Sequence, residues 1–332
     1  MKSVISKITI FIAILLFLTL PVSCNSKDMQ YEDVKGFRIR KVSDYPFYEM
    51  YYFEGYRANF TGLPTSAKRD FACSLFSAKS NTGEIFLGRN FDWDHSPALL
   101  LYTYPSEGYR SISMVNLDFL GITVADAEEL LPLSDSDRQK LSRAPFLPTD
   151  GMNEAGLAVG MAAVPFSQDD THPENPEIGS LGVIREMLDI AATVEEALRI
   201  MEKYTIDFGE GPPIHYLIAD AKGDSAVVEY GSGKMKVIRN EGIWIAATNF
   251  LLEGAGDNPE LMCDRFQKIS EKLESSSGRI TVNSGLDILS NVSQGTPLAD
   301  GTQWSALYLL TKGELQLALG RDFENILTFS LD

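Results

Sequence analysis

Short runs in which apolar and polar residues alternate dominate the chain from residue 73 onward, and this alternation predicts β-strands. Glycine, asparagine and other turn-forming residues separate many of these runs. The predicted strands cover residues 73–79, 84–90, 98–104, 110–116, 156–164, 215–220, 225–230, 235–240, 243–249, 304–310, 314–320 and 325–331.

Other segments carry apolar residues at helical spacing instead. One of them opens with Thr193 and has Glu196 three residues later, which is the sequence of a capping box. The predicted helices cover residues 178–192, 193–204, 258–274 and 281–291, and a polar helical patch covers 125–142. Two blocks of strands, each joined to a pair of helices, predict an α+β fold in which two sheets pack face to face between outer helices, a four-layer αββα sandwich.

The first 23 residues differ from the rest of the chain. Lys2 and Lys7 precede an apolar run at residues 8–20, which is typical of an export signal and too short for a membrane span. Small residues stand before Cys24, and this pattern suits lipoprotein processing, in which the thiol is acylated. We therefore expect residues 1–23 to be a signal peptide and Cys24 to carry the lipid of an exported bacterial lipoprotein, periplasmic or attached to the outer membrane. Ordinary secretion and a retained anchor helix remain open.

Residues 24–72 are polar and aromatic, and we expect them to form a lipid-anchored N-terminal segment or propeptide ahead of a domain at 73–332. The proline and small residues at 61–68 are typical of a linker. The aromatic run at 45–56 either packs this segment onto the core or forms a carbohydrate-binding surface.

Charge excludes one class of partner. The sequence carries a net charge of −17, and removing residues 1–23 takes away two lysines and no acidic residue. Such a surface repels nucleic acid phosphates and anionic lipids, so we expect no nucleic-acid partner and membrane contact only through the N-terminal lipid. His95, His172 and His215 lie far apart without metal-binding spacing, so the sequence predicts neither a metal nor an organic cofactor.

Cys73 opens a predicted hairpin whose two strands are joined by the polar turn SNTG at residues 80–83. If Lys79 faces Glu84 across this turn, then Cys73 faces Asn90. A change of one residue in this register would still leave the thiol beside the same short segment of the second strand.

Arg89 and Asp92 therefore lie close to Cys73 in the predicted hairpin. A nearby guanidinium favours the thiolate, which is the nucleophilic form of cysteine. Asp92 can hold an ammonium group, and the α-amine released by a cut before Cys73 has a pKa that suits a general base. Two alternatives remain: Cys73 pairs with Cys263 in a disulfide, or Arg89 and Asp92 form only a surface ion pair.

A cysteine at the start of a strand followed by GRNFD at residues 88–92 resembles the choloylglycine hydrolase family, whose members are N-terminal-nucleophile (Ntn) hydrolases of linear amides. Further segments are similar to the family's in the same order: DGMNEAGLAVG at 150–160, PPIHYLIADAKGDSAVVEY at 212–230, ATN at 247–249, DRF at 264–266 and TQWSALY at 302–308. The resemblance covers most of residues 73–332 and implies the αββα fold.

The resemblance implies a role for each matching side chain around the thiol. Cys73 is the nucleophile, and its freed α-amine is the base. Arg89 and Arg265 tune or position the thiolate, and Asp92 holds the amine.

The resemblance also implies an oxyanion hole made by the Asn249 side chain and a backbone N–H ten residues after Asn153, which is that of Ala163. Alanine keeps this backbone donor and lacks the larger side chains that relatives often carry there, so substrate recognition is expected to differ. Only 15 residues separate Asn249 from Arg265, where tetrameric relatives have a long insertion. The sequence therefore leaves the oligomeric state open.

The expected activity is hydrolysis of a linear, non-peptide amide C–N bond in a small N-acyl substrate of the bile-salt, penicillin V, N-acyl amino acid or lipid amide type. The nucleophile is an N-terminal Cys73 freed by autoproteolysis. The alternatives are an acyltransferase on the same site and a catalytically inactive lipoprotein that binds an acyl ligand. His215 as the base of a Cys/His pair is less consistent with its place in an apolar strand, and Cys263 is expected to be a small buried apolar residue.

Overall fold

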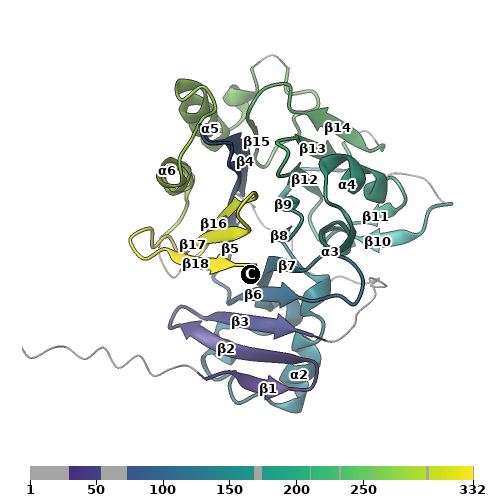
Figure 1. Ribbon diagram of the computed structural model, residues 1–332, viewed down its shortest axis with the longest axis vertical. Helices are drawn as coiled ribbons and strands as arrows, with labels where there is room; N and C mark the ends of the chain where they lie inside the picture. Colours follow the sequence, from purple (N-terminus) through teal and green to yellow (C-terminus); the bar gives the residue numbers. More distant parts are fainter. Residues whose placement is uncertain are drawn as a thin grey trace, which may run out of the picture.

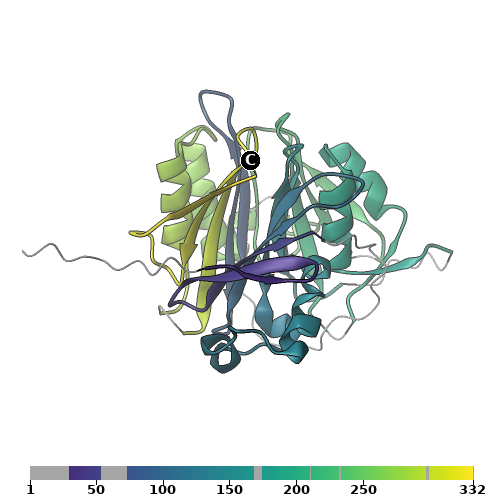
Figure 2. The ribbon, with the colours of Figure 1, turned by 60° about the horizontal axis from the view of Figure 1, so that its bottom comes forward.

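The computed structural model describes residues 30–53, 73–167, 174–209, 211–231, 233–256, 258–296 and 299–331. Within them two large β-sheets lie face to face, and a pair of helices covers the outer side of each sheet (Figure 1). Figure 2 shows the resulting four layers from another direction. The predicted α+β fold with αββα layers is confirmed, whereas the predicted signal peptide, Cys24 and the linker at 61–68 lie outside the described residues.

The larger sheet has ten strands, all of which pair antiparallel except β3 with β6. In spatial order they are β1 (Glu32–Val34), β2 (Phe37–Ser43), β3 (Phe47–Tyr52), β6 (Ala98–Thr103), β7 (Ser111–Asn116), β8 (Asp150–Asn153), β9 (Ala158–Ala163), β12 (Ile214–Ala219), β13 (Ser225–Glu229) and β14 (Lys236–Arg239).

The smaller sheet has six antiparallel strands. In spatial order they are β15 (Ile245–Ala247), β4 (Ser74–Lys79), β5 (Ile85–Trp93), β16 (Gly301–Leu309), β17 (Glu314–Leu319) and β18 (Leu327–Ser330). A separate parallel pair is formed by β10 (Glu177–Gly179) and β11 (Thr205–Asp207).

The longer helices form the two outer layers. Helices α3 (Gly182–Ile190) and α4 (Val194–Met201) pack on the ten-stranded sheet, and α5 (Asp264–Ser275) and α6 (Val282–Val292) pack on the six-stranded sheet (Figure 2). The shorter elements are α1 (Val124–Glu128), α2 (Asp135–Leu141) and the 3₁₀ helices Leu117–Leu120, Ala144–Phe146 and Pro259–Met262. No helix within the described ranges is long and apolar enough to cross a membrane.

The helix boundaries differ from the predicted ones where other contacts compete. Thr193 caps α4 as predicted, but the Glu196 carboxylate accepts the N–H of Ala192 at 2.7 Å instead of closing a capping box. The helix predicted at 258–274 is broken at Cys263, which has extended backbone angles and precedes the first turn of α5.

Residues 30–53 of the predicted N-terminal segment form strands β1 to β3 at one edge of the ten-stranded sheet (Figure 1). Within the aromatic run Phe47, Tyr48 and Tyr52 are buried, and the Tyr48 hydroxyl donates to the carbonyl of Ala127. Part of the aromatic run therefore packs this segment onto the core, as one of the two interpretations of it predicts.

The two sheets approach each other closely where β4 crosses β9. A Cβ atom added at Gly160 would lie 2.4 Å from Leu75 Cδ2, so any larger residue at this crossing would force the Leu75 side chain to move. The Arg89 side chain passes the same point. The close approach brings the N-terminal end of β4 next to the C-terminal end of β9, which is where the predicted site residues lie.

Candidate active site

The hairpin of β4 and β5 carries Cys73 to the end of the six-stranded sheet, with a register one residue away from the predicted one. Ser74 pairs with Asn90, whereas the prediction placed Cys73 opposite Asn90. The reason lies in the turn: Ser80 and Glu84 are bonded to each other through backbone and side chain, which leaves a three-residue loop ending at Gly83 with a φ of +94°. The shift keeps the thiol beside Asp92.

Arg89 lies against the thiol in a fully buried position. Its Nη2 is 3.7 Å from Cys73 Sγ, and its Nη1 is bonded to the Asp150 carboxylate and donates to the carbonyl of Thr149 at 3.1 Å. The guanidinium also lies 4.6 Å from the ring centre of Phe91. The interpretation of Arg89 and Asp92 as a surface ion pair is therefore wrong, because both side chains are buried and Arg89 is paired with Asp150.

The protonation of Cys73 reflects two opposing effects. Burial raises the pKa of the thiol, while the positive charge of Arg89 and a backbone hydrogen bond from Asp92 act in the opposite direction. Burial is the largest of these effects, so the pKa of the Cys73 thiol is raised above that of free cysteine. Cys73 and Cys263 are both free, which excludes the disulfide between them as an alternative.

Asp92 is buried beside Cys73 with one oxygen bonded and one without a partner. Its Oδ1 accepts from the Thr302 hydroxyl at 2.5 Å, and no described residue donates to its Oδ2. Burial raises the pKa of this carboxyl to about 6, against the lowering effect of the Thr302 hydrogen bond. A buried carboxylate oxygen without a donor is unfavourable, so the position suits a cationic partner that the described residues do not supply.

Arg265, in the first turn of α5, joins the start of β4 to Asn249. Its Nη1 bonds the carbonyl oxygen of Cys73 and donates to the Ser74 hydroxyl at 3.0 Å, and its Nη2 donates to Asn249 Oδ1 at 3.0 Å. Because the Asn249 oxygen accepts from a guanidinium, its amide nitrogen must point the other way. That nitrogen donates to the carbonyl oxygen of Ala163 at 2.7 Å.

The peptide of Ala163 points toward the same place. The N–H of Val164 donates to the carbonyl oxygen of Pro213, so the backbone polar groups of Val164 face β12. In an antiparallel ladder the next residue faces the opposite way, and the N–H and carbonyl of Ala163 therefore face the β8 side of β9. The β8 ladder reaches only as far as the pairing of Asp150 with Gly160. The N–H of Ala163 therefore lies beyond the end of β8, next to the Asn249 amide.

All six predicted residues of the reaction centre, Cys73, Arg89, Asp92, Ala163, Asn249 and Arg265, thus belong to one set of contacts that joins β4, β5, β9 and the start of α5. Asn249 reaches it because β15, predicted at 243–249, pairs with β4 in the six-stranded sheet.

Residues that sequence reasoning did not single out complete the support of this site. Asp150 accepts from Tyr308 at 2.5 Å, from Trp304 at 3.4 Å and from the Thr149 hydroxyl at 3.0 Å, besides its pairing with Arg89. In the sequence, Asp150 is marked only by its place at the start of the segment 150–160. The family resemblance of that segment draws attention to Asn153 and not to Asp150. In the structure Asn153 is fully bonded to the backbone of α3 and of its own turn, which is a structural role.

Two other residues lie outside the reaction centre. His215 is buried in β12 and its Nδ1 lies 3.0 Å from Glu229 Oε1, as expected of a packed strand residue. Cys263, expected to be buried, is half-buried before α5. In the described ranges no three His, Cys, Asp or Glu side chains gather in a way that could hold a metal ion.

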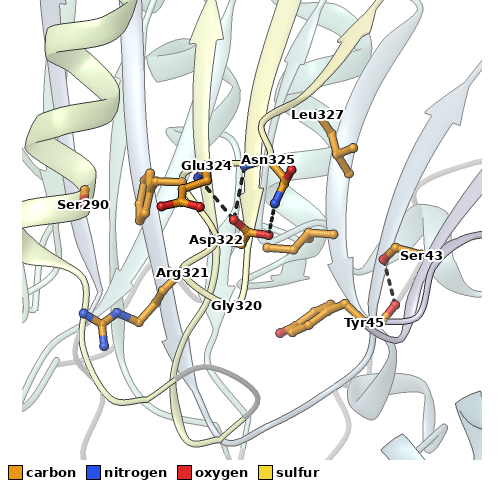
Figure 3. A pocket seen from close by; sticks show the side chains of 11 residues that line it. Ser43, Tyr45, Ser290, Gly320, Arg321, Asp322, Glu324, Asn325 and Leu327 are labelled. Atoms are coloured by element: carbon orange, nitrogen blue, oxygen red, sulfur yellow. Dashed lines mark hydrogen bonds between the residues drawn. The ribbon is translucent and has the colours of Figure 1, made fainter. Parts of the chain in front are cut away.

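A cavity of about 670 Å³ lies between the turn at 43–45, α6 and the loop from β17 to β18. Figure 3 shows that Asp322 turns toward its own loop, where it accepts from the backbone of Glu324 and Asn325. None of the six predicted site residues lines this cavity, and β5 and β16 separate its β17 wall from β4. The cavity is therefore separate from the candidate site at Cys73.

The comparisons with known proteins agree with this geometry. Residues 73–250 match the linear amide C–N hydrolases of the choloylglycine hydrolase family. An uncharacterized protein of Archaeoglobus fulgidus is 27% identical over 180 residues, which are 51% of this chain and 25% of that protein. The match thus spans only a quarter of that relative's length.

Solved structures share the fold. Two variants of the conjugated bile acid hydrolase from Clostridium perfringens superpose with TM-scores of 0.56 and 0.57 at 16% and 17% identity, covering 78% of this chain and 92% of theirs. Penicillin V acylase from Agrobacterium tumefaciens superposes with a TM-score of 0.56 at 19% identity, covering 78% of this chain and 86% of its own. These similarities show that the chain shares the fold of these proteins.

Proposed function

The chain belongs to the choloylglycine hydrolase family of linear amide C–N hydrolases, and from this premise we propose that it hydrolyses the amide bond of a small N-acyl substrate with Cys73 as an N-terminal nucleophile. The observation that carries the proposal is the arrangement at the start of β4. There the Cys73 thiol lies 3.7 Å from Arg89 Nη2 and next to Asp92, whose buried Oδ2 has no donor among the described residues.

The first step of the proposed mechanism is a cut between Ala72 and Cys73, which gives Cys73 a free α-amine. The resulting ammonium is the cation that suits the unpartnered Oδ2 of Asp92. With this charge and that of Arg89 nearby, the thiolate becomes more favourable than in the uncut chain. The α-amine has a pKa in the range required of a general base, so the site needs no histidine.

In the acylation step the Cys73 thiolate attacks the carbonyl carbon of the N-acyl amide. The negative charge that develops on the carbonyl oxygen is stabilised by the second N–H of the Asn249 amide and by the N–H of Ala163. The amide C–N bond then breaks, the α-ammonium protonates the leaving nitrogen, and the acyl group remains on sulfur as a thioester. The bond from Arg265 to the Cys73 carbonyl supports this step by fixing the nucleophile's backbone.

In the deacylation step the neutral α-amine takes a proton from water, and the hydroxide formed attacks the thioester. The acid is released and the thiolate is restored. The same oxyanion donors serve both steps because both pass through a tetrahedral intermediate.

The test is a panel of N-acyl amides of the bile-salt, penicillin V, N-acyl amino acid and long-chain types, with released amine and released acid measured separately. We expect equal amounts of both products with the purified protein and none with Cys73→Ala. Mass spectrometry of the active protein should show a fragment that begins at Cys73. Full activity of a protein in which the bond between Ala72 and Cys73 is intact would overturn the proposal. Acyl transfer to an added amine without release of acid would show that the reaction is an acyl transfer and not a hydrolysis.

We also propose export as a lipoprotein through Cys24, on the sequence pattern alone. Labelling with a fatty acid should mark the wild-type chain and not Cys24→Ala. A chain that is exported without label would favour ordinary secretion.

A further inference from the structure

The proposed mechanism leaves one buried pair of ionisable groups without a role. His215 of β12 and Glu229 at the end of β13 are both fully buried, and His215 Nδ1 lies 3.0 Å from Glu229 Oε1. They face each other across the β12–β13 ladder, one position beyond the pairing of Tyr216 with Val228. A buried carboxylate and imidazole are unfavourable unless they are bonded, so the other contacts of the pair indicate what it does.

Glu229 uses both carboxylate oxygens to hold the backbone that follows Asn249. Its Oε1 accepts the N–H of Leu252 at 2.8 Å, and its Oε2 accepts the N–H of Glu253 at 3.0 Å. Burial disfavours the charge, yet the hydrogen bonds from His215 and from these two amides hold the pKa of Glu229 below its ordinary value. Since an ionised carboxylate can only accept, His215 must donate from Nδ1.

His215 stands next to the other half of the candidate oxyanion hole. In the β9–β12 ladder it faces Ala162, and Ile214 faces Ala163. The Tyr216 hydroxyl donates to Ser180 on the helical side of the sheet, so the alternating side chain of His215 lies on the side of the six-stranded sheet. The pair therefore spans from the strand that neighbours Ala163 to the loop that carries Asn249.

Asn249 needs support of this kind because little regular structure holds it. It follows the three-residue strand β15, and its side chain is fixed at Oδ1 by Arg265 and at Nδ2 by Ala163. Beyond Asn249, Phe250 packs against Phe266 in the core, and the backbone after it, at Leu252 and Glu253, is held by Glu229.

We propose that His215 and Glu229 are a positioning pair for the oxyanion hole. Glu229 anchors the backbone at Leu252 and Glu253, and His215 orients Glu229. Together they keep the Asn249 amide at the distance from the Ala163 N–H that the transition state requires. The inference rests on the proposed function of Asn249. Neither residue contacts the substrate in this scheme. Both act through Asn249, and a displacement of about 1 Å at such a donor lowers turnover by up to roughly 10²-fold.

The first test is Glu229→Gln, which keeps the shape but replaces one acceptor oxygen by an NH₂ group that meets a backbone N–H. We expect kcat to fall about 10- to 100-fold while KM changes less than about threefold, because the oxyanion donors act on charge that develops in the transition state. The matched control is Asp220→Asn. Asp220 is equally buried, follows β12 at the opposite end of the same hairpin, and accepts the backbone N–H groups of Val194, Lys222, Gly223 and Asp224. A similar loss of kcat in both variants would show that general stability accounts for the effect and would overturn the proposal.

The second test uses His215 and remains available if Glu229→Gln does not fold. His215→Asn places an N–H donor close to the position of Nδ1, whereas His215→Leu removes the donor. We expect His215→Asn to retain most of the turnover and His215→Leu to lose about 10-fold or more in kcat. Equal turnover in the two variants would overturn the orienting role of His215.

The third test separates this inference from the proposed function through a double-mutant cycle. In an Asn249→Ala background, Glu229→Gln should lower kcat by less than about threefold, because its effect passes through a side chain that is already absent. A full loss in that background, with Asn249→Ala itself impaired, would overturn the positioning role and leave the proposed function intact. An Asn249→Ala enzyme with normal turnover would overturn the oxyanion role on which both rest.

Discussion

Asp150 holds Arg89 against the thiol of Cys73. The guanidinium bonds the carboxylate through Nη1, while Nη2 of the same group lies 3.7 Å from Cys73 Sγ. Because Asp150 also accepts from Tyr308 and Trp304, its own position is fixed by the strand β16. The location of the positive charge beside the Cys73 thiol is therefore determined by a residue on the other sheet.

Replacing Asp150 by asparagine should affect both stability and turnover. The change leaves the Arg89 charge buried without its anion, and breaking a buried ion pair in this way typically costs about 3–5 kcal/mol. We expect the free energy of unfolding, measured with denaturant, to fall by that order and kcat to fall with it. The control is Glu154→Gln, which breaks an exposed ion pair with Arg110 of 2.6 Å and should cost less than about 1 kcal/mol. Equal effects of the two changes would contradict the buried role of Asp150.

Asp92 should make the stability of the uncut chain depend on pH. Burial raises its pKa from 3.8 to about 6, so the folded state favours the protonated carboxyl. The stability that this provides is fully present below the unfolded pKa and is lost as the pH rises through about 6. We expect Cys73→Ala to lose on the order of 2–3 kcal/mol of unfolding free energy between pH 4 and pH 7, relative to Cys73→Ala with Asp92→Asn.

The cut protein provides the comparison for this pH dependence. An α-ammonium on Cys73 beside Asp92 Oδ2 would favour the ionised carboxylate and so weaken the loss of stability toward neutral pH. The free energy of unfolding is measured over the same pH range for protein with Asp92 and for the Asp92→Asn variant. The difference between these two values is then compared between the cut and the uncut protein. Identical pH dependence in both forms would mean that the amine does not reach Asp92.

Two substitutions at Asn249 should separate its two hydrogen bonds. Asn249→Asp keeps an oxygen for Arg265 but cannot donate to an oxyanion, and Asn249→Ala loses both bonds. Loss of one oxyanion donor typically lowers kcat by about 10²–10³-fold, so we expect both variants to fall by that order with little change in KM. Asn175→Ala, which removes an amide that donates to the carbonyl of Glu202 outside the site, is the control. A loss confined to KM would show that Asn249 binds substrate in its ground state.

The N-terminal segment should stay attached after a cut before Cys73. Strand β3 pairs along its whole length with β6, and the Tyr45 hydroxyl donates to Gln303 at the start of β16. We expect both fragments to elute together in gel filtration under native conditions and to separate in denaturant. Tyr45→Phe should weaken the association only slightly, because one hydrogen bond contributes about 1 kcal/mol. Separate elution of the fragment that begins at Cys73 would contradict the role of β1 to β3 in the sheet.

The hairpin at Cys73 shows what alternation along the chain can predict. The period of two identified the strands 73–79 and 84–90 and brought the thiol, Arg89 and Asp92 to one end. It did not fix the register, because that depends on the bond between Ser80 and Glu84, which no periodicity reveals. An error of one residue was harmless here since several site residues lie within two positions of each other.

Sheet membership and support residues were harder to predict. The strands 235–240 and 243–249 follow each other in sequence, yet β14 lies in the ten-stranded sheet and β15 pairs with β4 in the other one. Alternation indicates which side chains share a face but not which strand lies alongside. Asp150 was missed for a similar reason: its partners Arg89, Trp304 and Tyr308 are distant in sequence, and only the packed fold joins them.

The parallel pairing of β3 with β6 has a consequence for how the chain must fold. In the precursor these strands belong to one molecule, and their encounter is intramolecular at any dilution. Once the bond before Cys73 is broken, the same pairing joins two separate polypeptides. Refolding of the processed protein from denaturant should then become second order and fail at low concentration, whereas the Cys73→Ala precursor should refold at a rate that dilution does not change. Processing would thus make the folding equilibrium depend on protein concentration, and at high dilution the lifetime of the assembled protein would be set by how slowly β3 separates from β6.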